Sequence, residues 1–189
     1  LAALCYTNDI FTGYVFIEVC TIASCSLLML TKRTRALVAA TRYMIFSLIG
    51  SSLVLVGIIL LYSITGHLLF PQLFSTIQGL WATGEYTMPL TVALGLIVSG
   101  LAIKSGMFPF HFWMPDTYGT ATPAASGILS GVISKAYIFL LLKIIFRVIG
   151  YEVFLDSKIQ YVLFIFGICG MIVGSVSAIK TNNMRFMIA

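Results

Sequence analysis

The chain has 189 residues, of which 60% are hydrophobic and 9% charged, and its mean hydropathy is +1.06. Ordinary soluble domains carry roughly 25% charged residues, so this composition excludes a water-soluble globular domain and indicates that lipid is the main solvent. The net charge of +5 comes from basic residues between apolar stretches, as the positive-inside rule describes, and without interleaved exposed aromatics it does not indicate a nucleic-acid partner.

Long, unbroken apolar stretches predict membrane-spanning helices, because a span needs about 20 mainly apolar residues. The strands of a membrane barrel would instead alternate in polarity over about 10 residues. We therefore expect an all-α, polytopic transmembrane helix bundle, with residues 1–189 as a single membrane domain. Because the chain begins with Leu1 and stops just after a basic turn, we interpret it as an internal piece of a longer protein.

The first two predicted spans lie on either side of a basic segment. A polar break at Asn8 and Asp9 suits a helix N-cap, and the first complete span is expected over residues 10–30. The second is expected over residues 43–62. The segment between the two spans carries four basic residues: Lys32, Arg33, Arg35 and Arg42.

A mixed segment and an interrupted span come next. Residues 73–81 can form a short interfacial helix with Trp81 at headgroup level. The third span, expected over residues 89–114, does not end cleanly. Three helix breakers interrupt its aromatic end: Gly106, Pro109 and Pro115. Such backbone is tolerated at membrane depth only when it is buried in protein or lines a watery cavity, so we expect a discontinuous helix.

The last two spans are expected over residues 123–146 and 159–178. Basic residues are more frequent on the side of the 31–42 segment and of Lys180 and Arg185 than on the opposite side, which favours the first side as cytoplasmic. The expected location is therefore multi-pass in a cell inner or plasma membrane, with an organelle inner membrane as the alternative.

Three ionisable residues fall inside the apolar spans: Glu18, Lys104 and Lys135. At about 1.5 Å per residue each lies near mid-membrane, where a charge costs at least about 2.5–3.5 kcal/mol on insertion scales. Pairing offsets that cost, so we expect Glu18 to face one of the lysines. Burial favours the neutral amine and a nearby carboxylate favours the ammonium, and a lysine balanced between them can exchange a proton. The alternative is a static ion pair that fixes helix packing.

Small and polar residues support Lys135 and the interrupted span. Gly127, Gly131 and Lys135 recur every fourth residue and share one helix face, which fits a helix-packing face or a lysine site. His111 in the interrupted stretch is a candidate proton relay or a hydrogen-bonded structural histidine. A neighbouring stripe on the fourth span carries hydroxyls, of which the last two are further relay candidates: Ser126, Ser130 and Ser134.

The sequence predicts no metal or cofactor site in this chain. None of its four cysteines belongs to a pair or a cysteine–histidine cluster with zinc or iron–sulfur spacing. They are typical of small apolar helix residues.

One stretch also resembles a known family. The residues from Lys104 to Asp116 (KSGMFPFHFWMPD), followed by residues 121–126 (ATPAAS) and Lys135, closely resemble the antiporter-like subunit family. That family includes the proton-pumping membrane subunits of respiratory complex I (NADH:quinone oxidoreductase) and related subunits of membrane-bound hydrogenases and multisubunit sodium/proton antiporters. The resemblance covers nearly the whole chain.

The resemblance implies roles for the candidate residues. Glu18 matches the family's glutamate, which pairs with the lysine at Lys104. Lys135 matches a lysine or histidine that passes protons toward the centre of the membrane. The chain then corresponds to about one inverted five-helix repeat of a larger protein, without the second repeat. With a lysine rather than a histidine at position 135, the chain resembles three branches of the family: the D subunits of sodium/proton antiporters, the hydrogenase subunits and the middle subunits of complex I.

The leading hypothesis is a proton-translocating or cation/proton-antiporting membrane subunit of a respiratory-type translocase such as NADH:quinone oxidoreductase. Its expected partners are other integral membrane subunits, the lipid bilayer, and protons or sodium ions. Any flavin, iron–sulfur cluster or quinone is expected on partner subunits. The alternatives are a stand-alone sodium/proton antiporter without redox chemistry, a structural subunit whose buried charges only hold helices together, and a membrane oxidoreductase in its own right.

Overall fold

The computed structural model describes residues 2–30 and 33–188 of the chain. Lys32 and the side chain of Arg185, both counted among the basic residues above, lie outside the described part. Every named element within these ranges is a helix, which confirms the all-α prediction. Among the described residues, five helical segments are long and apolar enough to cross a membrane: Ile10–Met29, Thr34–Thr65, Thr87–Thr120, Pro123–Ile149 and Ile159–Lys180.

The polar break near the start of the chain joins two helices, α1 (Ala2–Tyr6) and α2 (Ile10–Met29). The carboxylate of Asp9 caps α2 by accepting the N–H of Phe11 at 2.8 Å. The backbone groups at the break pair with the chain just before α4, where the N–H of Phe70 donates to the carbonyl of Asn8 at 3.0 Å. The break is therefore a fixed junction with satisfied backbone groups.

Helix α3 (Thr34–Thr65) begins well before the expected start at residue 43. Its additional residues are mostly alanine, leucine and arginine, which are good helix formers, so the helix continues out of the apolar region into the basic segment. It ends at Gly66, whose φ of 71° allows the N–H to cap the carbonyl of Tyr62 at 2.8 Å.

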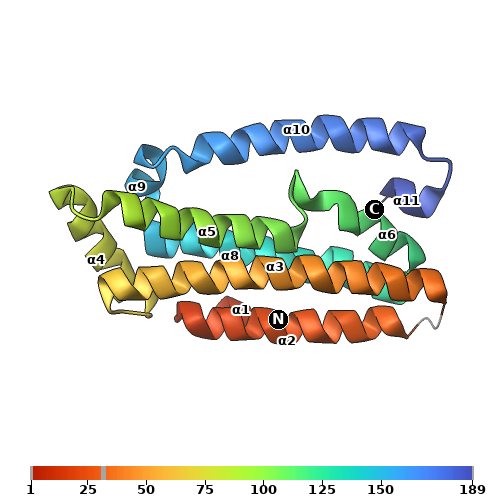
Figure 1. Cartoon of the computed structure of the whole chain (residues 1–189), viewed down its shortest axis with the longest axis horizontal. Coiled ribbons are helices and arrows are strands. Elements are labelled where there is room, and N and C mark those ends of the chain that lie inside the picture. Colours follow the sequence, from red (N-terminus) through yellow and green to blue (C-terminus); the bar gives the residue numbers. More distant parts are fainter. Residues whose placement is uncertain (1, 31–32, 189) are drawn as a thin grey trace.

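Helix α4 (Phe70–Thr83) contains the expected short helix around residues 73–81. The Trp81 ring nitrogen donates to a carboxylate oxygen of Asp156 at 3.4 Å, which ties the end of α4 to α9 (Tyr151–Asp156). This corner lies at the left-hand end of the molecule in Figure 1.

The interrupted span is discontinuous, as the sequence predicted. Helix α5 (Thr87–Ser105) ends at Gly106, whose φ is 72°, and the chain passes Pro109 before the 3-10 turn η1 (Phe110–Phe112) and helix α6 (Trp113–Thr120). The expectation that Pro115 also breaks the helix is wrong. It lies in the first turn of α6, where the missing N–H of a proline leaves no helical bond unmade.

The fourth span contains two π-helical turns. Helix α7 (Pro123–Ile128) leads through η2 (Leu129–Ile133) into α8 (Ser134–Ile144), which ends in η3 (Ile145–Ile149). Such turns occur frequently at functional sites. In Figure 1 this span runs behind α3 and α5.

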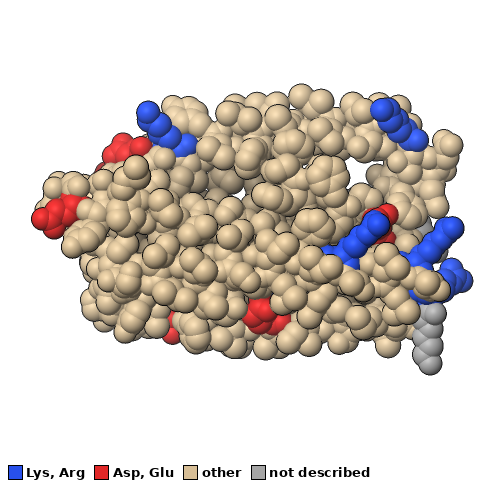
Figure 2. Space-filling model, in the orientation of Figure 1, with Lys and Arg blue, Asp and Glu red and all other residues tan. Residues whose placement is uncertain are grey.

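The final span, α10 (Ile159–Lys180), lies along the upper edge of the bundle and leads to α11 (Met184–Ile188) (Figure 1). None of its residues is buried by the rest of the described chain. Basic side chains gather at the right-hand end of the molecule, over the α2–α3 and α10–α11 connections (Figure 2). In this view basic side chains are therefore more frequent at one end of the bundle, although one also lies at the upper left.

Candidate functional site

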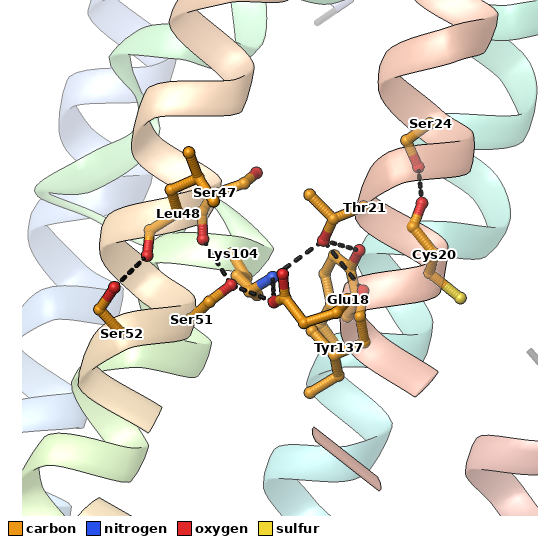
Figure 3. Close-up of polar contacts among 11 residues, drawn as sticks. Glu18, Cys20, Thr21, Ser24, Ser47, Leu48, Ser51, Ser52, Lys104 and Tyr137 are labelled. Carbon is orange, nitrogen blue, oxygen red and sulfur yellow. Dashed lines mark hydrogen bonds and ion pairs between the residues drawn. The ribbon is translucent and has the colours of Figure 1, made fainter. Parts of the chain in front are cut away.

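A buried ion pair lies at the centre of the bundle. The Lys104 ammonium, in the last turn of α5, is 3.0 Å from the nearer carboxylate oxygen of Glu18 on α2. The Lys104 side chain has no exposed surface, whereas that of Glu18 is 25% exposed. Figure 3 shows the two side chains pointing toward each other between their helices. This is the cross-helix pairing that the cost of isolated charges predicted.

Hydroxyl groups complete the surroundings of the pair. Thr21 accepts a hydrogen bond from the Lys104 ammonium at 2.8 Å and gives its own proton to the carbonyl of Ile17 at 2.9 Å. The Ser51 hydroxyl on α3 contacts the same Glu18 oxygen, and it also lies 2.8 Å from the carbonyl of Ser47. Hydrogen bonds to charged groups are stronger than neutral ones, so these hydroxyls hold both charges in place.

A tyrosine on the fourth span closes the lysine end of the site. The Tyr137 hydroxyl on α8 lies 3.4 Å from the hydroxyl of Thr21 (Figure 3). The Lys104 ammonium lies 5.8 Å from the centre of the Tyr137 ring, within the range of a cation–π contact. Sequence reasoning missed Thr21, Ser51 and Tyr137, because their helical positions indicate a shared site only once the faces of α2, α3, α5 and α8 are known to meet.

Two glycines allow the backbone to carry Lys104 into this position. A Cβ added to Gly100 on α5 would lie 2.5 Å from the carbonyl oxygen of Gly50 on α3. A Cβ on Gly50 would lie 3.1 Å from Cγ of Lys104. The two helices therefore touch backbone to backbone one turn before the lysine, and the lysine stem lies over Gly50. Small residues permit this close approach in membranes.

The other lysine candidate lies apart from the pair. Lys135 on α8 is exposed, as are Gly127 and Gly131 on the same face. Lys135 makes no hydrogen bond or ion pair with another residue in the described ranges. The structure therefore brings Glu18 and Lys104 together and leaves Lys135 on the outer face of its helix.

The two serine candidates on the fourth span differ in burial. Ser134 is buried and its oxygen lies 2.8 Å from the hydroxyl of Tyr118 on α6, whereas Ser130 is half-buried. Ser134 precedes Lys135 directly but points into the bundle. Of the predicted stripe, Ser134 is therefore the hydroxyl that the structure buries in the bundle, next to Lys135 in the chain.

His111 has aromatic neighbours. Its ring stacks on Phe108 at 5.6 Å and on Phe112 at 4.6 Å between ring centres. Its Nδ1 atom is buried and has no hydrogen-bond partner within the described residues. These contacts place His111 in the interruption between α5 and α6, and no contact links it to Glu18 or Lys104.

The described residues contain no group of three or more histidine, cysteine, aspartate or glutamate side chains that could hold a metal ion.

Away from the central pair, the Arg42 guanidinium contacts the carboxylate of Asp116 and so joins α3 to α6 at the basic end of the bundle. That second pair is largely exposed, with 58% and 43% of the two side-chain surfaces accessible. It is a surface contact, distinct in character from the buried one.

Known proteins are similar to this chain in both sequence and fold. Over residues 7–189 the chain matches the family described as NADH:quinone oxidoreductase/Mrp antiporter, TM. It is 31% identical over 190 residues to NADH-quinone oxidoreductase subunit N of Desulforudis audaxviator, covering 100% of this chain and 36% of that protein. It is 29% identical over 182 residues to the D subunit of the Na(+)/H(+) antiporter of Bacillus subtilis, covering 96% of this chain and 36% of that protein.

A solved structure has a similar fold. A chain of the membrane-bound sulfane sulfur reductase, an archaeal respiratory membrane complex, superimposes with a TM-score of 0.85 at 28% identity, covering 96% of this chain and 36% of that one. The chain thus spans little more than a third of the length of these proteins. The matched residues include the buried pair, the interrupted helix and the fourth span. The chain is a multi-pass integral membrane protein that belongs to the NADH:quinone oxidoreductase/Mrp antiporter transmembrane family.

Proposed function

We propose that this chain forms a proton-conducting half-channel of a multisubunit membrane complex, in which Lys104 takes up and releases the transported proton under the control of Glu18. The observation that supports this most is the Lys104 ammonium, which is fully buried and 3.0 Å from the Glu18 carboxylate. An ion pair that only held the helices together would not need either side chain to be exposed. Here the carboxylate remains partly accessible, so its charge can be changed from outside the described bundle.

The chemistry follows from the low dielectric of the site. Charges a few ångströms apart interact far more strongly in a protein interior than in water. While Glu18 is ionised and in contact, it stabilises the ammonium. If the carboxylate moves away or takes up a proton, the ammonium loses its counter-charge and its proton becomes easier to release. The buried pair is therefore a charge switch, and each proton passed requires a change in Glu18.

Lys135 provides the proposed onward step. Lys135 is exposed on α8 and directly follows Ser134, which is buried in the lining of an internal void that Lys104 also lines. His111 and Ser130 remain secondary relay candidates, supported by their positions in the interruption and on the fourth span. An uncompensated lysine at this depth requires a partner or water. We propose that integral membrane subunits or further transmembrane helices supply it.

The relatives support two versions of this function. One is named as a subunit of NADH-quinone oxidoreductase and the other as a subunit of a Na(+)/H(+) antiporter. We propose protons as the transported ion and other integral membrane subunits as partners, with sodium exchange as the alternative. The sequence lacks cofactor-binding cysteine sets and glycine fingerprints. Any flavin, iron–sulfur cluster or quinone therefore belongs, in this proposal, to partner subunits.

The test uses the full-length subunit in its complex in membrane vesicles, with the proton gradient followed by a pH-sensitive dye. Lys104→Ala is expected to abolish the gradient while the complex still assembles. Lys180→Ala is the matched control, because that lysine lies exposed at the end of α10. An undiminished gradient in Lys104→Ala would count against the proposal. Repeating the assay with and without sodium separates proton pumping from sodium/proton exchange.

A further inference from the structure

Beyond the ion pair, Lys104 also lines a narrow internal void that Glu18 does not line. The polar groups that line this void come from α3, α6 and α8. In the arrangement described, the void has no volume wide enough for a water molecule. Its lining combines the lysine with hydroxyl-bearing and aromatic side chains: Tyr43, Trp113, Tyr118, Ser134 and Tyr137.

A pair of hydroxyls closes the void on the α8 side. The oxygens of Tyr118 and Ser134 are 2.8 Å apart, and both residues are buried, at 5% and 4% exposure. Ser134 also lies 3.0 Å from the carbonyl of Leu129, which can only accept. The Ser134 proton therefore goes to Leu129, and Tyr118 donates its own proton to Ser134. The two hydrogen bonds therefore run in one direction, from Tyr118 through Ser134 to the backbone carbonyl of Leu129.

The π-helical turn produces this arrangement. Through η2 the N–H of Ser134 bonds to the carbonyl of Leu129, five residues earlier, and the side-chain hydroxyl reaches the same oxygen. The turn also sets the faces of α8 so that Ser134 points inward while Lys135 is exposed. Two consecutive residues, about 100° apart around the helix, thus differ in their surroundings: Ser134 is buried against Tyr118, and Lys135 is exposed.

We propose that the Tyr118–Ser134 hydroxyl pair is a proton gate between Lys104 and the outer face of α8, closed in this structure. It opens when the Ser134 hydroxyl turns away from the Leu129 carbonyl. This inference rests on the proposed function, because it supplies the route by which the proton of Lys104 would reach the side of Lys135. The void is too narrow for water in this arrangement, so hydroxyls are the groups available to carry the proton across it.

The transfer balances atom by atom. In the proposed step the Lys104 ammonium first turns from Thr21 toward the void that it lines together with Tyr118. It then gives a proton to the Tyr118 oxygen as Tyr118 passes its phenolic proton to Ser134. Once its hydroxyl has turned away from Leu129, Ser134 releases its own proton to a water that enters beside the neighbouring Lys135, and Lys135 takes the proton up from that water. Each oxygen ends with one proton and Lys104 ends as the neutral amine. While the Ser134 proton is held by Leu129, the last step has no acceptor and the gate stays shut.

The experiment measures the initial rate of proton-gradient formation by the complete complex in membrane vesicles. Tyr118→Phe keeps the ring that packs edge-on against Trp113 at 6.2 Å and removes only the hydroxyl. Ser134→Ala removes the second hydroxyl, and Ser134→Thr retains it. Thr117→Val is the matched control, since among the residues that the structure describes that buried hydroxyl on α6 bonds only to the carbonyl of Trp113. Assembly of each variant is checked by sedimentation of the intact complex.

Tyr118→Phe and Ser134→Ala are expected to lower the rate by on the order of tenfold or more, as for loss of a proton-transfer group. Thr117→Val and Ser134→Thr are expected to stay close to the wild-type rate. Wild-type rates in Tyr118→Phe and Ser134→Ala, beside an inactive Lys104→Ala, would overturn the gate and leave the proposed function standing. An equal loss in Thr117→Val or Ser134→Thr would also overturn it, because the hydroxyls would then not be what matters. A wild-type rate in Lys104→Ala would overturn the proposed function itself.

Discussion

Gly50 on α3 and Gly100 on α5 face each other so closely that a Cβ on Gly100 would lie 2.5 Å from the carbonyl oxygen of Gly50. Lys104 follows Gly100 by one helical turn, and its Cγ lies 3.1 Å from the Cβ position of Gly50. The depth at which the ammonium meets Glu18 therefore depends on two residues without side chains. A single methyl group at this contact would have to push the helices apart.

Gly100→Ala is expected to destabilise the protein and to impair transport. The added methyl overpacks a rigid contact, which typically costs about 1–3 kcal/mol, and the shift of α5 moves Lys104 away from Glu18. The thermal unfolding midpoint of the purified complex and its transport rate would both fall. Gly95→Ala is the control, because a Cβ there meets nothing within 4 Å. An unchanged midpoint in Gly100→Ala would contradict the close contact.

Thr21→Val is expected to slow transport without preventing assembly. Valine keeps the shape of threonine but cannot accept the 2.8 Å hydrogen bond from the Lys104 ammonium. A hydrogen bond to a charged group contributes about 1.5–3 kcal/mol. Its loss therefore shifts the equilibrium between the ammonium and the neutral amine of Lys104 by roughly tenfold or more. The measurement is the transport rate in vesicles. Ser26→Ala on the exposed face of the same helix should have no effect, and equal rates in both variants would argue against a role for Thr21.

Lys135→Gln is expected to stop transport while the complex still assembles. The side chain is exposed and makes no ion pair among the described residues, and glutamine keeps a polar group of similar length for the partner or water that we propose beside it. The proposed onward step needs an amine that can take up a proton, which glutamine cannot provide. Normal transport in this variant would restrict the proton path to Glu18, Lys104 and the residues around them.

The sequence predicts the fold well where apolar length decides it. Five long apolar stretches, the interruption around Gly106 and Pro109, and the pairing of Glu18 with a lysine all follow from the cost of placing polar groups in lipid. The start of α3 differs from the prediction because its basic first turns are helical without being apolar. Pro115 does not interrupt α6 because a proline in the first turn is compatible with a helix.

The rest of the site depends on how the helices face one another. Thr21 lies one turn after Glu18 and is within reach of a helical-wheel argument. Ser51 and Tyr137 come from other helices, and their contribution depends on close packing that one-dimensional periodicity does not contain. Either lysine could have faced Glu18 on sequence grounds, but the register set by the π-helical turn points Ser134 inward and leaves Lys135 outside. Local helix geometry, more than composition, therefore determines which polar residue faces Lys104.

The central claim is that Glu18 and Lys104 act as one unit in moving the proton. The most direct measurement is a double-mutant cycle on the proton gradient formed by the complete complex, using Glu18→Gln, Lys104→Met and the combined variant. Residues that act as a unit are strongly non-additive. The account predicts that each single variant loses most of the transport rate and that the double variant loses no more than either. Losses that multiply in the double variant, or a single variant that transports at the wild-type rate, would contradict it.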